Sequence, residues 1–167
     1  MNQIIFGNLV ETRKQLLDEI TTLSFEELNT VLRSDTWSVA QVCHHLYLAE
    51  KSFVHGINYA LKQKDSPKVE PKSIGRISDR TKKVDAPSFI IPGEEPFEIH
   101  HILNMLKESR TMLLNVLNKI ESDSILRDKS AKHPLFGELP LIQWIELIYL
   151  HEQRHIEQIN EIKSQIL

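Results

Sequence analysis

Hydrophobic residues recur along this chain with the spacing of amphipathic α-helices, and four long segments carry the pattern. The segments cover residues 3–20, about 38–62, 97–121 and about 140–165. In each of them apolar side chains return every three or four positions, which places them on one stripe of a helix. The first stripe holds Ile4, Ile5, Leu9, Leu16, Leu17 and Ile20, and the third holds Leu103, Leu106, Leu113, Val116, Leu117 and Ile120. Four long helices in a chain of this size predict an all-α fold, a four-helix bundle.

The starts of several helices are marked by specific residues. Ser24 with Glu27 forms a capping box that opens a short helix, and Ser38 with Gln41 forms a second one that opens the long helix 38–62. Pro140 suits the first turn of the last helix, because a proline there loses no helical hydrogen bond. Alternation typical of strands is not visible at convincing length, so no sheet is predicted.

A long segment, residues 63–96, separates the second and third long helices and shows no regular period. It carries many charges and five prolines, namely Pro67, Pro71, Pro87, Pro92 and Pro96. The composition allows a disordered linker. We favour an irregular excursion packed over one end of the bundle, since compact domains rarely keep a long loop without a use. Phe89, Ile90 and Ile91 are its expected apolar anchors, and a connection of this length permits a non-sequential order of neighbouring helices.

Composition and charge narrow the class of protein. The 167 residues suit one domain, 1–167, and 41% apolar with 26% charged residues is ordinary for a soluble protein. A net charge of -3 does not favour nucleic acid or an acidic membrane surface as a partner. Cys43 is the single cysteine, which excludes an internal disulfide. We expect a cytoplasmic protein, because no signal peptide or membrane-spanning run is evident.

Two histidines four residues apart in the last helix are the main chemical signal. His151 and His155 share a narrow sector of that helix with Trp144, Ile148 and Ile162, so both rings are expected to face the bundle axis. Buried imidazoles need polar partners. A metal ion is one such partner, and a carboxylate, a carbonyl group or water are others. Eight histidines make one such pair plausible by chance, so the spacing alone is weak.

The second long helix supplies a candidate third ligand. His45 shares a face with Val42 and Ala49, whereas its neighbour His44 lies on a more polar face and is expected at the boundary. Three neutral imidazoles with an open fourth position are typical of a catalytic metal site. Zinc, nickel, manganese and ferrous iron all accept imidazole, so the metal is not distinguished. We expect structural roles for the remaining histidines, His55, His100, His101 and His133.

Residues 151–155 also match the zinc-peptidase motif H-E-x-x-H, in which Glu152 would be the general base. Such enzymes take a third ligand from downstream, and only twelve residues follow His155. No strand is evident that would pair with a peptide substrate. Glu152 lies about 80° from the histidine stripe. It is therefore a candidate catalytic base on a metal-activated water, or a residue facing solvent at a helix boundary.

Several segments together resemble the DinB/YfiT-like superfamily. Residues 37–46, WSVAQVCHHL, are similar to its W-S-x-x-x-[VIL]-x-x-H-[LI] signature. Residues 133–139, HPLFGEL, followed by Trp144, resemble its H-P-x-x-G-x-L…W segment. Residues 151–159, HEQRHIEQI, resemble its closing H-x-x-x-H-x-x-Q-[IL] helix. The resemblance covers nearly the whole chain, although His44 departs from the residue that commonly precedes the ligand.

This resemblance implies a bundle of up-down-down-up order, often a homodimer, with a divalent metal held by three residues. Carried onto this sequence, the ligands are His45, His151 and His155, the same three that the helix faces select. The activities that this resemblance implies are those of the family: transfer of a low-molecular-weight thiol such as bacillithiol, mycothiol-dependent isomerisation and metal-dependent hydrolysis.

The functional hypothesis is a divalent-metal-dependent enzyme acting on a small molecule. It is either a low-molecular-weight-thiol S-transferase of the bacillithiol type or a hydrolase, because a metal with an open position lowers the pKa of a bound thiol or water. Glu152, Arg154 and residues of the 63–96 segment are candidates for orienting substrate. Cys43 shows no sign of activation as a nucleophile. The alternative is a non-catalytic metal-binding or small-ligand-binding protein with a role in stress response.

Overall fold

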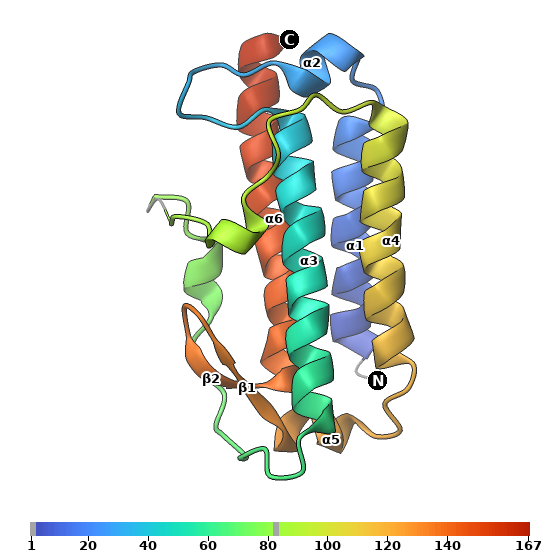
Figure 1. The fold of residues 1–167 in the computed structure, drawn as a ribbon, viewed down its shortest axis with the longest axis vertical. Coiled ribbons are helices and arrows are strands. Elements are labelled where there is room, and N and C mark those ends of the chain that lie inside the picture. The colour runs from blue at the N-terminus through green and yellow to red at the C-terminus, as the bar shows by residue number, and fades with distance from the viewer. Residues whose placement is uncertain (1–2, 82–83) are drawn as a thin grey trace.

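Four long helices lie side by side and form the body of the molecule (Figure 1). The structure is a computed structural model that describes residues 3–81 and 84–167. The long helices are α1 (Gln3–Ile20), α3 (Val39–Lys62), α4 (Ile99–Leu117) and α6 (Leu141–Ile166). Helices α1 and α6 run in one direction along the long axis, and α3 and α4 run in the other (Figure 1). The predicted four-helix bundle of up-down-down-up order is confirmed.

The long connection between α3 and α4 follows from this order. Consecutive helices that run parallel require the chain to return along the bundle, and the 24 residues of α3 span about 36 Å. The segment climbs along the outside of α3 and α6 and contains two short 3₁₀ turns, η1 (Gly75–Ser78) and η2 (Ser88–Ile90) (Figure 1). Residues 82 and 83 of this segment lie outside the described residues.

The described part of this excursion is packed against the bundle rather than extended into solvent. The Gln143 side chain of α6 clamps the backbone of Lys72, accepting from its N–H at 2.9 Å and donating to its carbonyl at 2.7 Å. The expected anchors were wrong in part: Phe89 and Ile91 are 61% and 53% exposed, and Ile74 is the buried anchor. The η2 turn sends neighbouring side chains in different directions, so a run of three apolar residues cannot all face the bundle.

Two short helices and one hairpin complete the fold. They are α2 (Phe25–Asn29), α5 (Asp123–Asp128), and the antiparallel strands β1 (Ser130–His133) and β2 (Gly137–Pro140). The strands were not predicted because four residues are too few to show a period of two. Gly137 takes a positive φ of 70° in the turn. The indole N–H of Trp144 donates to the Ala131 carbonyl at 3.2 Å, which fixes the hairpin to α6.

Both predicted capping boxes are present, at Ser24 with Glu27 and at Ser38 with Gln41. In each, the serine side chain accepts from the backbone three residues on, and the partner side chain accepts from the serine N–H. Pro140 caps α6 instead of occupying its first turn. Among the described residues, no helix has the length and apolarity to cross a membrane.

The apolar interior is divided into two clusters by a polar layer. On α1, for example, Leu9 belongs to one cluster and Leu16 to the other, and buried Thr12 and Arg13 lie between them. The other three long helices show the same division. The polar groups of this layer form two sets, which we call the histidine cluster (His45, His151 and His155) and the charge network (Arg13, Glu50, Arg110 and Glu152).

Candidate metal centre

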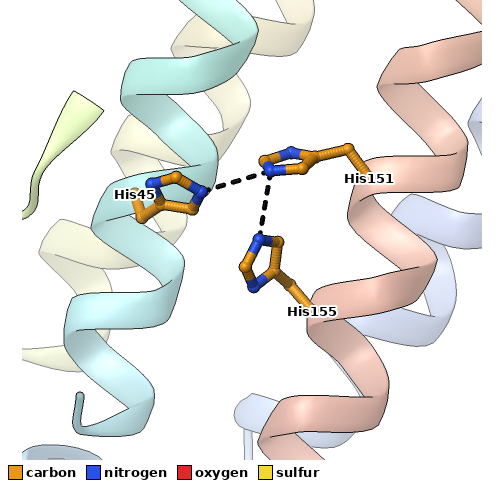
Figure 2. A group of neighbouring side chains, drawn as sticks. All are labelled: His45, His151 and His155. Atoms are coloured by element: carbon orange, nitrogen blue, oxygen red, sulfur yellow. Dashed lines mark hydrogen bonds between the residues drawn. The ribbon is translucent and has the colours of Figure 1, made fainter. Parts of the chain in front are cut away.

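The histidine cluster brings together three ring nitrogens from two helices. His45 projects from α3, and His151 and His155 project from consecutive turns of α6 toward it (Figure 2). Nε2 of His151 lies 3.2 Å from Nε2 of His45 and 3.0 Å from Nε2 of His155. The ligand atoms of all three residues lie within 4.8 Å of one another. His45 and His155 are buried, and His151 is half-buried.

Hydrogen bonds on the far side of two rings determine which nitrogen carries the proton. Nδ1–H of His45 donates to the Ile90 carbonyl of η2 at 2.8 Å, and Nδ1–H of His155 donates to Oε1 of Gln158 at 2.7 Å. Nε2 of each ring is therefore a lone pair directed at His151. A neutral His151 has one ring proton, so it can donate to Nε2 of His45 or to Nε2 of His155, but not to both. The other Nε2 lone pair then faces the Nε2 atom of His151 with no proton between them. A cation at the point of convergence would satisfy all three.

The spacing of the nitrogens fits a divalent metal ion. Metal–imidazole bonds of about 2.0–2.1 Å in tetrahedral geometry place ligand nitrogens about 3.3 Å apart. The observed 3.0 and 3.2 Å are close to that value. No fourth His, Cys, Asp or Glu of the described residues joins the group, so the three histidines leave one position of a tetrahedral shell for a ligand from outside the protein. These residues therefore suit a three-histidine site with an open position.

Burial keeps the three imidazoles neutral, which is the form that binds metal. Burial lowers the pKa of His155 to about 3, with the nearby His45 as a further cause. The pKa of His45 is lowered by burial, and that of His151 is lowered well below its usual range by burial and by the two neighbouring imidazoles. At neutral pH no proton competes for the converging lone pairs.

His44 and His45 both bond the backbone of residues 90–93 in the excursion, one as an acceptor and the other as a donor. Nδ1 of His44 accepts from the Gly93 N–H at 3.0 Å, while Nδ1–H of His45 donates to Ile90. His44 is half-buried and does not join the cluster, as its polar helix face predicted. The Trp37 ring packs 4.9 Å from the His45 ring, measured between centroids. The excursion thus forms one wall of the histidine cluster.

Glu152 points into the core of the bundle and away from the converging nitrogens. Its carboxylate accepts from Thr12 Oγ1 at 2.7 Å, from Nε of Arg13 at 2.6 Å and from Nη2 of Arg110 at 3.1 and 3.3 Å. The side chain is buried, so the interpretation that it faces solvent is wrong. This geometry does not support Glu152 as a general base, because both of its carboxylate oxygens accept hydrogen bonds from donors of α1 and α4.

The charge network was missed by sequence reasoning. Arg13 bridges Glu50 at 2.8 Å and Glu152 at 2.6 Å, and Arg110 bonds Glu50 at 2.6 Å and Glu152 at 3.1 Å. Burial raises the pKa of Glu50, but the guanidinium groups of Arg13 and Arg110 outweigh it and hold that pKa below its usual range. Two cations and two anions make the set neutral overall, which limits the cost of burying it.

His133 has a structural role, as expected, and it also packs near the histidine cluster. It does shape the turn, since its Nδ1 accepts from the Leu135 N–H at 3.1 Å. Its ring also stacks on Phe53 with centroids 5.8 Å apart, and Phe53 packs 6.3 Å from the His151 ring. Burial lowers the pKa of His133 to about 4. A neutral imidazole therefore lies one aromatic ring away from the histidine cluster.

Other predicted groups lie outside the cluster. The guanidinium of Arg154 donates to the carbonyls of Ile77 and Asp79, so it holds the excursion beside η1. Cys43 is fully buried, and burial raises the pKa of its thiol to about 12, which does not suit a nucleophile. His55, His100 and His101 are exposed and stand apart from the three ligand candidates.

Comparison with known proteins agrees with this architecture. The sequence pattern of the DinB superfamily matches residues 8–159. The chain belongs to the DinB superfamily. Uncharacterized protein YuaE of Bacillus subtilis (strain 168) is 29% identical over 159 residues, covering 93% of this chain and 95% of that protein.

Two solved structures share the fold of this DinB superfamily chain. TT2238, a four-helix bundle protein, superposes with a TM-score of 0.65 at 20% identity and covers 94% of this chain and 96% of its own. YfiT from Bacillus subtilis, described as a probable metal-dependent hydrolase with an unusual four-helix bundle topology, gives a TM-score of 0.64 at 20% identity. That match covers 97% of this chain and 85% of YfiT.

Proposed function

We propose that this protein is a divalent-metal-dependent enzyme that acts on a small molecule, with His45, His151 and His155 as the metal ligands. One observation carries the proposal. Three Nε2 atoms converge, and the Nδ1–H groups of His45 and His155 are already committed to Ile90 and Gln158. A metal cation can bond all three lone pairs, whereas a single proton can be shared by two nitrogens at most. Three protein ligands among the described residues favour a catalytic site with an open position over a structural site, which usually has four protein ligands.

The chain's own residues would orient the metal ligands and shape the approach to them. Ile90 and Gln158 fix the tautomers of His45 and His155, which sets the direction of both lone pairs. Trp37 and Phe53 give the surroundings an aromatic character. When bound, a divalent ion supplies Lewis acidity that activates water or a thiol at neutral pH. We assign Glu152 a structural role, because its oxygens are engaged in the charge network.

Two reactions are compatible with this site, and they differ in the nucleophile. Hydrolysis is favoured by likeness to YfiT, which is described as a probable metal-dependent hydrolase. Transfer of a low-molecular-weight thiol to an electrophile is the other, and the neutral aromatic walls suit an apolar electrophile. The buried Cys43 thiol does not act as the nucleophile in either reaction.

Metal analysis tests the first part of the proposal. The protein is purified without a histidine tag, reconstituted with zinc, nickel, manganese or ferrous iron, and examined by elemental analysis. We expect one ion per chain in the wild type and in His55→Ala, whose side chain is exposed. His151→Ala should bind no ion at stoichiometric level. A wild type that takes up none of the four metals would overturn the proposal.

Activity assays then separate the two reactions. The reconstituted protein is given a chromogenic electrophile with and without a low-molecular-weight thiol, and separately a panel of esters and amides. Conjugation that requires both thiol and metal would identify a transferase, and thiol-independent cleavage would identify a hydrolase. A metal-loaded protein inactive on both panels would favour the non-catalytic alternative, a metal-binding or small-ligand-binding protein.

A further inference from the structure

A small cavity separates the histidine cluster from the charge network. Its volume is about 10 Å³, and it is lined by Arg13, Leu46, Glu50, Phe53, Ile148, His151 and Glu152. This is close to the minimum room that one water molecule needs. A water also needs two or more polar partners, and this lining offers charged groups from α1, α3 and α6 as well as an imidazole. The cavity is therefore suited to hold water, unlike a void enclosed by apolar side chains.

His151 differs from the other two ligand candidates in the partner of its second ring nitrogen. Nδ1 of His45 and Nδ1 of His155 each bond an oxygen, whereas no described residue supplies a partner for Nδ1 of His151. Figure 2 shows this nitrogen on the edge of the ring that faces away from His155. That edge faces the preceding turn of α6, where Ile148 lines the cavity. Because His151 and Ile148 both line the cavity, this edge of the ring is the one we assign to the cavity side.

Counting acceptors identifies the carboxylate that can bond this water. A carboxylate has about four lone-pair sites. Glu152 accepts four contacts, from Thr12, from Arg13 and twice from Arg110. Glu50 accepts three: its Oε2 takes Arg13 and Ser109, and its Oε1 takes only Arg110. One site remains on Oε1 of Glu50.

We infer that one water molecule occupies this cavity, accepts from Nδ1–H of His151 and donates to Oε1 of Glu50. This inference rests on the proposed metal site. The water completes a pattern in which every ligand imidazole has its Nδ1 proton bound by an oxygen, and it fixes the third Nε2 as a lone pair. Glu50 is then a positioning residue for His151, acting through the water. The charge network in turn holds Glu50 in place from α1 and α4.

A matched pair of variants tests this role. Glu50→Gln and Glu152→Gln are isosteric, and each removes one negative charge from the same network, so their losses of stability should be similar. Zinc affinity is measured for both by competition with a chelator. In Glu50→Gln the amide oxygen stays with the two donors at the Oε2 position, Arg13 and Ser109, so the amide NH2 faces the water and removes its acceptor. We expect zinc binding to weaken by about 10–100-fold, the usual effect of losing a partner of a metal-bound histidine. Glu152→Gln should change it less than about threefold. Equal losses in the two variants would overturn the inference.

Two measurements on the unaltered protein keep the inference testable if a variant fails to fold. In the zinc form, ¹⁵N-histidine NMR should show a slowly exchanging Nδ1 proton on His151. A high-resolution crystal structure should show a water within hydrogen-bond distance of both Nδ1 of His151 and Oε1 of Glu50. A dry cavity, or a water bonded to Glu152 alone, would contradict it. The crystal structure can be read without metal, so failure of the proposed function and failure of this inference are distinguishable.

Discussion

The histidine cluster and the charge network lie next to each other in the same polar layer, yet their hydrogen-bonding states are opposite. In the network, each carboxylate oxygen faces at least one donor and the four charges cancel. In the cluster, nitrogen faces nitrogen at 3.0 and 3.2 Å, and the protons of His45 and His155 are on the outer edges of their rings. His151 of α6 belongs to the histidine cluster, and the next residue, Glu152, belongs to the charge network.

This difference underlies our proposal that the charge network serves stability and the histidine cluster serves metal binding. A buried set of groups that satisfies itself needs no ligand, and it costs stability when any member is removed. A buried set of converging lone pairs is stabilised when a cation binds to it. The two regions are therefore expected to respond in opposite ways to mutation and to metal.

The largest effect is expected from breaking the charge network. Arg110→Met removes ion pairs to Glu50 and Glu152 and leaves two buried anions with Arg13 as their one cation in the network. We expect the free energy of unfolding to fall by about 3–5 kcal/mol. Urea denaturation followed by circular dichroism measures it. The exposed pair of Lys68 with Asp128 provides a control, and Lys68→Met should leave the unfolding midpoint unchanged.

A second variant shows whether charge balance is the cause. Adding Glu50→Gln to Arg110→Met leaves Arg13 with Glu152, so the set is neutral again. Part of the lost stability should return. A double variant less stable than Arg110→Met alone would show that packing and not charge dominates this region.

Metal should stabilise the other region by a comparable but smaller amount. A ligand that binds only the folded state at one hundred times its dissociation constant adds about 2.7 kcal/mol. For a domain of this size that raises Tm by roughly 5–10 °C. Thermal unfolding with and without zinc measures the shift. His155→Ala should abolish the shift while folding normally in the absence of metal, and a shift that persists in this variant would place the metal elsewhere.

The two regions also differ in how far the sequence predicts them. The histidine cluster follows from helix phase, because His45, His151 and His155 each lie on an apolar stripe and carry a distinctive side chain. The network shows a similar signal: Arg13 follows Leu9 by four positions, and Arg110 follows Leu106 by four. A long charged side chain on a stripe is usually read as reaching solvent. Arg13 and Arg110 can be interpreted as buried residues only once their ion-pair partners are known.

Those partners depend on the order of the helices in space. Arg13 and Glu152 come from opposite ends of the chain, and they meet because α1 and α6 pack side by side. Helical periodicity does not specify which helices are neighbours. The contact of His133 with Phe53 has the same origin, since it needs the hairpin to fold back over α3. Local periodicity therefore predicted the helices and the inward histidines, while the charge network and the contacts between distant segments required the structure.

The pH dependence of stability offers a smaller test near the boundary of the histidine cluster. Burial lowers the pKa of His133 to about 4 from 6.5. The unfolded chain therefore takes up this proton first as pH falls, so the stability gained from a neutral His133 is complete above pH 6.5 and is lost toward pH 4. His133→Asn can still accept from the Leu135 N–H and does not titrate. Its unfolding free energy should depend less on pH in this interval.

The size of that difference is bounded. One proton corresponds to about 1.4 kcal/mol per pH unit, and the half-buried ring is screened by solvent, so the measured difference in slope should be smaller. Urea titrations at several pH values between 4 and 7 measure it for both proteins. Identical slopes in wild type and variant would show that His133 keeps its ordinary pKa in the folded protein.

The smallest effect is expected from separating the two adjacent histidines of α3. His44→Ala removes the acceptor of the Gly93 N–H but leaves the bond from His45 to Ile90. Loss of one such hydrogen bond should cost about 0.5–1.5 kcal/mol. Hydrogen exchange should speed up at Gly93, and stoichiometric metal content should stay at the wild-type level. Loss of metal in His44→Ala would mean that the excursion, and not the three imidazoles alone, determines whether the cluster binds an ion.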